Sequence, residues 1–184
     1  SRAHHTNKMG PLQAPTLIQP ALAALFLEAS AMPTAQTRAA VHYRVEAADL
    51  HAHLYHVTLT IAQPTAVQEL ALPAWIPGSY LVREFARDLQ RLAARQGRQP
   101  VALVQLAKDR WRADCQAGQP LVLTYEVCAY DASVRTAWLD AARGFFNATS
   151  LCLQVAGQTA LPCEIDIVAP KKRAGSALWH CATG

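Results

Sequence analysis

Histidines are the first residues of this sequence to test for chemistry, because four of the seven lie close together: His42, His51, His53 and His56. On a strand, His51 and His53 share a face and His56 points the other way. A zinc ion needs three or four convergent ligands, and no carboxylate or cysteine stands beside them at ligand spacing. We therefore interpret them as half-exposed strand residues and predict no metal or cofactor in this chain.

Nucleophiles are weakly supported. Ser79 follows Gly78, but Leu81 stands where a Gly-x-Ser-x-Gly elbow has its second glycine. The five cysteines are odd in number and widely spaced, unlike a Cys-x-x-Cys zinc or redox site, so we expect free thiols. No histidine is followed by glutamate, which excludes the metallopeptidase motif His-Glu-x-x-His from this chain. A small hydrolase using Ser79 or a cysteine is the least favoured function.

Two blocks rich in aromatic residues are stronger candidates for a functional site. In residues 73–80, two prolines and a glycine fix an irregular backbone that carries Trp75 and Tyr80. Residues 130–150 carry further aromatic, acidic and amide side chains. A packed structural role is favoured for most of these residues, and the functional alternative is a pair of rigid loops that line a site. The candidates for such a site are Trp75, Ser79, Tyr80, Trp138, Asp140 and Asn147.

The elements that must position these blocks are short strands. Beyond Ala40, alternating or apolar runs separated by turn residues predict strands at residues 41–45, 53–61, 67–72, 101–106, 111–115, 121–130, 151–155 and 164–168. In the second run, Tyr55, Val57, Leu59 and Ile61 share a face that we expect to pack on the core. Because long helical stretches are missing, the pattern favours an all-β, antiparallel β-sandwich.

Composition sets the limits. The chain has 184 residues, of which 52% are apolar and 16% charged, and this fits one domain with or without a tail. The net charge of +4 is small and scattered, so we predict no nucleic-acid partner.

Residues 1–39 are interpreted as an unstructured or helical leader, separate from the domain at residues 40–184. The apolar run 17–27 is shorter than the roughly 20 residues that span a bilayer, so no membrane span is predicted. Its charged start and the small residues that follow are typical of a secretory signal, whereas Pro20, Glu28 and the lack of an initial Met argue against one. The alternative, which we favour, is that Met32 is the true start and the protein is cytoplasmic.

Long segments of the two blocks resemble a known family. Residues 75–85, Trp111, residues 133–140 and residues 144–147 resemble the N-terminal domain of the glycyl aminopeptidase family of zinc metallopeptidases. The resemblance covers about residues 41–184. It implies a parent protein with an N-terminal β-sandwich, a thermolysin-like catalytic domain that holds the zinc, and a C-terminal PDZ domain. Only the first part is here, so the fragment is expected to be inactive alone.

The resemblance also bears on residues 81–92, whose leucines and Phe85 recur at helical spacing. The family pattern instead implies a short helical segment near residues 81–86, followed by a strand from near Arg87 to Gly97. We predict this mixed structure.

The function that the resemblance implies is a noncatalytic module. It would pack on its own catalytic domain, help to wall the substrate cleft and contact the peptide substrate only indirectly, with Asp140 or Asn147 offering an oxygen to the peptide's amine. That function requires an exposed apolar patch on this domain. The alternative is a free-standing β-sandwich that binds carbohydrate or protein through aromatic residues exposed on a concave face.

Overall fold

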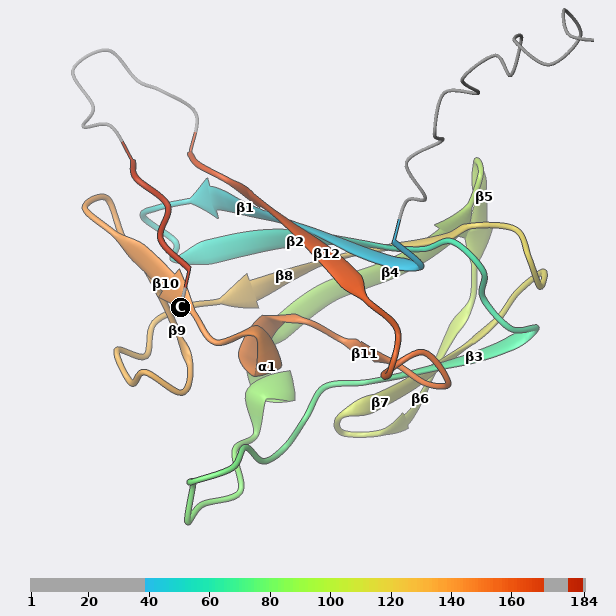
Figure 1. Ribbon diagram of the computed structural model, residues 1–184, viewed down its shortest axis with the longest axis horizontal. Coiled ribbons are helices and arrows are strands. Elements are labelled where there is room, and N and C mark those ends of the chain that lie inside the picture. The colour runs from blue at the N-terminus through green and yellow to red at the C-terminus, as the bar shows by residue number, and fades with distance from the viewer. Residues whose placement is uncertain (1–38, 171–178, 184) are drawn as a thin grey trace, which may run out of the picture. The chain divides into compact units, whose positions relative to one another are not determined.

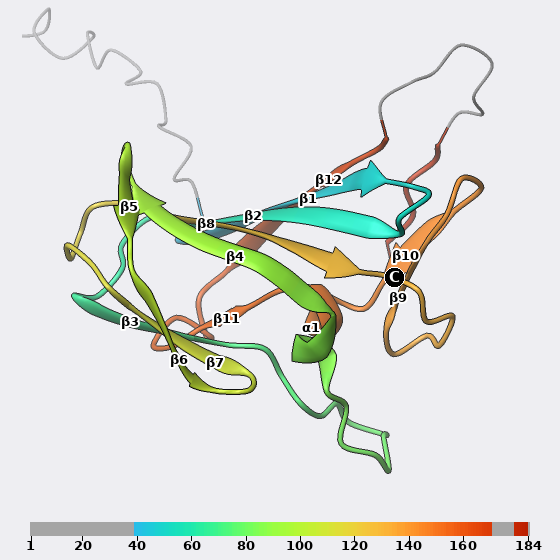
Figure 2. The ribbon, with the colours of Figure 1, turned by 180° about the vertical axis from the view of Figure 1, so that it is seen from behind.

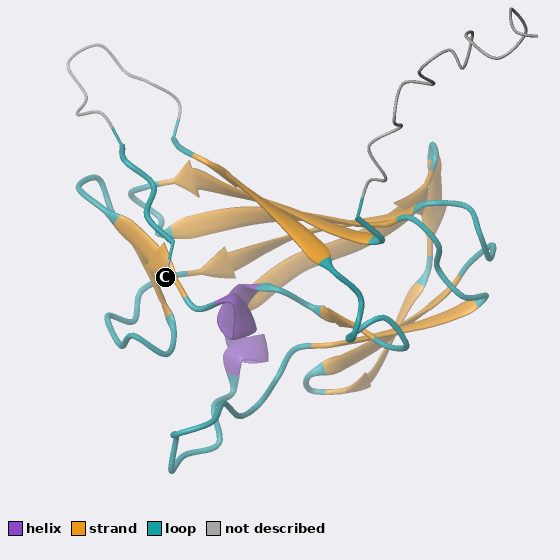
Figure 3. Cartoon of the chain, viewed as in Figure 1, coloured by secondary structure: helices purple, strands orange, loops and turns teal. Residues whose placement is uncertain are grey.

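The computed structural model describes residues 39–170 and 179–183, and strands dominate them (Figures 1 and 3). The prediction of an all-β sandwich is confirmed. The predicted leader lies, apart from Ala39, outside the described residues. Among the described helices, none has the length and apolar character needed to cross a membrane.

A six-stranded sheet forms one layer, in the order β12-β1-β2-β8-β4-β5. Its strands are β1 (Val41–Asp49), β2 (Leu54–Ile61), β4 (Leu89–Gln96), β5 (Gln99–Val101), β8 (Leu121–Cys128) and β12 (Cys163–Val168). Neighbours pair antiparallel except at one edge, where β12 pairs parallel with β1. A parallel pair needs a long crossover, and here the rest of the domain supplies it.

The second layer is a four-stranded sheet in the order β11-β3-β7-β6. Its strands are β3 (Val67–Ala71), β6 (Leu103–Ala107), β7 (Arg110–Asp114) and β11 (Gln154–Val155), while β9 (Ala137–Leu139) and β10 (Gly144–Phe146) form a separate hairpin. Figure 2 shows the two layers from behind. The single strand expected at residues 101–106 is wrong, because the chain leaves the large sheet after β5 and enters the small sheet as β6.

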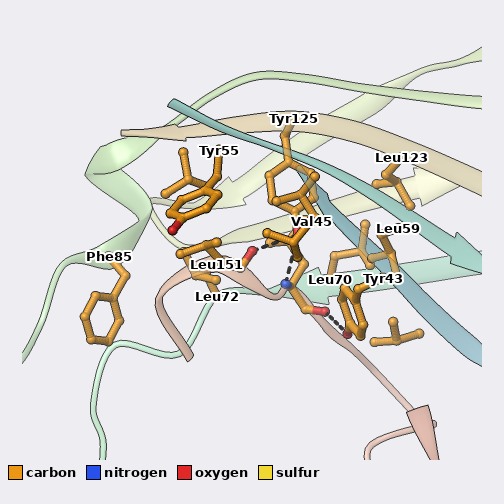
Figure 4. Packing of buried hydrophobic residues seen from close by; sticks show 14 of the residues in the cluster. Tyr43, Val45, Tyr55, Leu59, Leu70, Leu72, Phe85, Leu123, Tyr125 and Leu151 are labelled. Atoms are coloured by element: carbon orange, nitrogen blue, oxygen red, sulfur yellow. Dashed lines mark hydrogen bonds between the residues drawn. The ribbon is translucent and has the colours of Figure 1, made fainter. Parts of the chain in front are cut away.

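The core lies between the layers and follows the alternation of the strands. On β2 the expected apolar face is buried, as predicted. It packs with side chains of β8 and of the small sheet, and Figure 4 shows part of this cluster. Members from these elements are Tyr55, Val57, Leu59, Ile61, Leu70, Trp111, Ala113, Leu121, Leu123, Tyr125 and Val127.

Two short helices lie in the connections within the described residues. The 3-10 helix η1 (Phe85–Asp88) is followed directly by β4. The predicted order, a short helical segment and then a strand, is confirmed, but the helix begins later than the predicted residues 81–86. Burial of Phe85 anchors η1 on the core. The strand expected at residues 151–155 is confirmed only for its last two residues, which form β11, because α1 (Ala148–Leu151) occupies the start of that range.

Buried tyrosine hydroxyls hold the segment after α1 against the large sheet. Tyr125 donates to the Leu151 carbonyl at 2.8 Å and accepts from the Leu153 N–H at 3.3 Å. Tyr43 donates to the Leu153 carbonyl at 2.7 Å. Burial raises the pKa of both phenols above the usual value, so both stay protonated donors.

We expect Tyr125→Phe to lower the free energy of unfolding by about 1–3 kcal/mol, because it leaves a buried carbonyl and N–H without their partner. Tyr80→Phe is the matched control, since the exposed Tyr80 can lose its hydroxyl without burying an unpaired group. Urea denaturation of the two variants measures the difference, and equal stabilities would show that the buried hydroxyl contributes nothing.

Candidate functional site

The first aromatic block forms a projecting loop, residues 74–83, which we call the finger. It is the green loop that leads from β3 to η1 in Figure 1. Its base is closed by a hydrogen bond from the Arg83 N–H to the Ala74 carbonyl at 2.6 Å. Near its tip, the Trp75 indole donates to the Ser79 carbonyl at 2.8 Å. The finger is therefore tied together by its own polar groups.

The Ser79 hydroxyl belongs to this internal network. It donates to the Leu81 carbonyl at 3.0 Å and accepts from the Leu81 N–H at 3.3 Å and from Arg83 Nε at 3.4 Å. Ser79 is 9% exposed. These contacts shape the turn, and no histidine or carboxylate in the described part of the chain hydrogen-bonds to this hydroxyl as a base would.

The second block meets the finger through Arg135. Its guanidinium donates from Nη2 to the Gly78 carbonyl at 3.2 Å, a contact between residues 57 positions apart. Two blocks that the sequence presents separately thus form one region. Sequence reasoning missed this residue, because nothing in the chain's local pattern shows that Arg135 reaches a carbonyl in the other block.

Asp140 lies in the turn of the β9–β10 hairpin. Its Oδ2 accepts from the Trp138 indole at 2.8 Å, and its Oδ1 accepts from the N–H groups of Ala142 and Arg143 at 2.7 and 2.8 Å. The indole first, and then the two backbone donors, lower the pKa of this carboxyl below its usual value. Asp140 is consequently an ionised group that holds Trp138 and the turn in place.

Asn147 is the N-cap of α1. Its Oδ1 accepts from the N–H and the hydroxyl of Thr149 at 3.1 and 2.6 Å, which satisfies a donor that a helix start leaves unpaired. Its own N–H donates to the Thr136 carbonyl at 2.8 Å. The oxygen predicted to meet a substrate amine is therefore already used twice within the domain.

Aromatic rings gather beside the hairpin. Tyr130 stacks on Trp138 with ring centroids 5.0 Å apart, and His53 lies 4.4 Å from the Tyr130 ring. His53 also bonds through Nδ1 to the Leu139 carbonyl. It is thus a packed residue in the turn between β1 and β2, where its φ is 56°, and it is not the strand residue that the sequence predicted.

The other clustered histidines of the large sheet lie next to carboxylates. His42 contacts Asp166 at 2.9 Å, and His56 lies 3.6 Å from Glu46. Within residues 39–170 and 179–183, no group of three or more His, Cys, Asp or Glu side chains is arranged to hold a metal ion. All five cysteines have free thiols.

A small pocket of about 80 Å³ lies between η1 and the loop of residues 130–136. Asp88 and Asp131 both line it. The pKa of Asp88 is raised, mainly because the carboxyl is buried and to a lesser extent because the charge of Asp131 is close. Arg87 opposes this shift. The pocket therefore carries a partly compensated negative charge.

Apolar side chains are exposed where the two blocks meet. Tyr80 is fully exposed, with a relative accessibility of 105%, and Val134, the neighbour of Arg135, is 80% exposed. We define the apolar tip by its exposed members, Trp75, Tyr80, Leu81, Val82 and Val134. Four of these residues lie within the finger, and a group of exposed apolar side chains on one loop is typical of a protein interaction surface.

A β-sandwich that uses its polar side chains to brace its own loops, and exposes apolar ones at a loop tip, has the features of an interaction module. Residues 42–184 match the family model described as the Peptidase M61 N-terminal domain. The chain therefore belongs to this family, and the resemblance to a peptidase N-terminal domain is confirmed. A search among curated proteins gave no match.

One solved structure of high sequence identity agrees with this assignment. An aminopeptidase N family protein from Idiomarina loihiensis is similar over 71% of this chain, with 46% sequence identity and a TM-score of 0.69. This chain covers 22% of that protein. An M1 zinc metallopeptidase from Deinococcus radiodurans has 14% identity over 62% of this chain and 28% of that protein, with a TM-score of only 0.37. The chain thus spans less than a third of each protein.

We expect Asp140→Asn to lower the melting temperature at neutral pH, because an amide nitrogen cannot accept the Trp138 indole proton. The folded-state pKa of Asp140 is depressed, so its stabilisation is present above the normal carboxyl pKa and is lost as the pH falls through the folded value. The difference between wild type and variant should therefore shrink in acid. Thermal unfolding across pH measures it, with Asp109→Asn as the surface control; a difference independent of pH would contradict the charge-based account.

Proposed function

We propose that this chain is the N-terminal domain of a zinc-dependent aminopeptidase of the glycyl aminopeptidase type. It packs on the catalytic domain through the apolar tip and helps to wall the substrate cleft. The M61 family match and the 46% identity to part of a much longer aminopeptidase N family protein support this proposal. The catalytic domain that holds the zinc, and the PDZ domain, are assigned to the rest of the parent protein by the family resemblance alone.

The observation that carries the proposal is the apolar tip. Burying one Leu, Val or aromatic side chain contributes about 1.5–3 kcal/mol, so several such residues on one surface favour a partner protein. The finger is closed by hydrogen bonds at its base and near its tip, so little conformational entropy is lost when it docks. Aromatic side chains on a pre-organised loop are typical of interface hot spots.

The cleft-wall role follows from the needs of an enzyme that acts at a peptide's N-terminus. Such an enzyme must close one end of its cleft and neutralise a free ammonium group. Trp75, Ser79 and Tyr80 on the finger would form one part of the wall. Trp138, Asp140 and Asn147 on the second block would form the other part. Asp140 is better suited than Asn147 to bind the ammonium group, because its carboxylate is charged and its Oδ2 accepts only one hydrogen bond, whereas the neutral Asn147 oxygen already accepts two.

A free-standing carbohydrate- or protein-binding module is the second candidate, supported by the exposed Trp75 and the exposed Tyr130 stacked on Trp138. Sugar sites rely on aromatic platforms with polar neighbours, and the aliphatic Leu81, Val82 and Val134 favour a protein partner instead. We place the protein in the cytoplasm, where free thiols persist; export is the alternative.

Leu81→Asp in the full-length peptidase tests the proposal. We expect hydrolysis of a glycyl peptide to fall at least tenfold, because a carboxylate buried at the docking surface costs more than the about 1.4 kcal/mol that tenfold represents. Val104→Asp is the matched control, since Val104 is an exposed valine on β6 rather than on the apolar tip.

Equal activity of the two variants would show that the apolar tip is not part of the interface with the catalytic domain. In that case, binding of the wild-type 184-residue chain to an oligosaccharide panel would support the second candidate.

A further inference from the structure

We propose that Arg135 is a positioning residue that joins the finger and the loop of residues 130–136 into one docking surface. This inference rests on the proposed function, because it concerns how the apolar tip is presented to the catalytic domain. Its basis is the guanidinium contact with the Gly78 carbonyl at 3.2 Å, which spans the two blocks.

The contact is a charge-assisted hydrogen bond, which is stronger than a bond between neutral groups. None of the ion pairs found among the described residues includes Arg135, so no carboxylate competes for its guanidinium there. Arg135 is half-buried, and its contact with the Gly78 carbonyl lies at the exposed surface.

The loop that carries Arg135 is fixed by its own side chains. Asp131 Oδ1 accepts from the Ser133 N–H at 2.9 Å, and the Ser133 hydroxyl accepts from the Arg135 N–H at 3.3 Å. The Thr136 hydroxyl donates to the carbonyls of Asp131 and Ser133 at 2.9 and 2.7 Å. These local bonds hold the backbone of Arg135 in one conformation, so its side chain starts from a defined position.

The receiving carbonyl is fixed by a tight turn. Ser79 N–H donates to the Ile76 carbonyl at 3.2 Å, and Gly78 has a φ of +79°. Proline followed by a glycine at positive φ is the sequence of a type II turn. A Cβ atom at position 78 would meet no atom within 4 Å, so the backbone conformation rather than the space requires the glycine. The turn sets the direction of the carbonyl that Arg135 binds.

The consequence is a fixed relation between Val134 and the finger residues Tyr80 to Val82. Without the Arg135 bond, the two loops would sample positions independently, and docking would have to order them at a cost in entropy. That cost affects formation of the complete cleft and hence substrate binding. The atoms that react belong to the catalytic domain, so the rate of the bound complex should change little.

Arg135→Met and Arg135→Lys in the full-length peptidase test this inference. We expect Arg135→Met to raise KM for a glycyl peptide several-fold while kcat stays within about twofold, and to speed amide hydrogen exchange of residues 76–83 in the 184-residue chain. Arg135→Lys keeps a cationic donor and should restore KM in part. Arg95→Met is the matched control, because it removes a similar bond, from Arg95 to the Gly97 carbonyl at 2.8 Å, from a local turn.

Unchanged exchange at residues 76–83 in Arg135→Met would overturn the inference outright. Faster exchange with an unchanged KM would overturn the positioning role if Leu81→Asp still lowers activity. If Leu81→Asp also leaves hydrolysis of the glycyl peptide unchanged, the apolar tip is not the docking surface, and both the proposed function and the positioning role are contradicted. An equal rise of KM in Arg95→Met would show a general loss of stability rather than positioning.

Discussion

The bonds from buried tyrosine hydroxyls to the backbone after α1 are the constraint on which the rest of the structure depends. Tyr43 and Tyr125 come from the large sheet and fix the carbonyls of Leu151 and Leu153, as Figure 4 shows for Leu151. This segment passes beneath the sheet between α1 and β11, where it has few ladder partners of its own. The hydroxyls therefore supply the partners that a buried backbone needs.

A continuous series of contacts leads from this point to the apolar tip. At the start of α1, Asn147 N–H and the Ser150 hydroxyl both donate to the Thr136 carbonyl, at 2.8 and 3.2 Å. Thr136 closes the loop that carries Arg135, and Arg135 holds the finger at Gly78. The core thus determines where two otherwise separate surface loops lie, and a rigid scaffold positions the residues that we propose for function.

Much of the fold could be predicted from local pattern. Strict alternation identified β2 and its buried face, because one side of the strand packs on the core. Three features were missed when the sequence was interpreted by alternation alone. The parallel pairing of β12 depends on residues more than a hundred positions away, the division into β5 and β6 depends on a change of sheet, and α1 depends on the Asn147 cap overriding an apolar run.

The sequence showed which two blocks supply the candidate site, but not which residues of the two blocks are in contact. Proline, glycine and aromatic residues marked both blocks, yet only the three-dimensional structure brings Arg135 to Gly78. Asp140 and Asn147 were selected for their oxygens, and the structure shows that local N–H donors use them. The Asn147-Ala148-Thr149 and Ile76-Pro77-Gly78-Ser79 sequences carry the signals of a helix cap and a type II turn, which could have indicated these structural roles.

The most direct test of the central claim, that the apolar tip packs on the catalytic domain, is hydroxyl-radical footprinting of Tyr80. Its rate of modification is compared between this 184-residue chain and the proposed full-length peptidase, with Val104 as the internal reference. We expect strong protection of Tyr80 in the proposed full-length protein and no protection of Val104. Equal modification of Tyr80 in both proteins would contradict it.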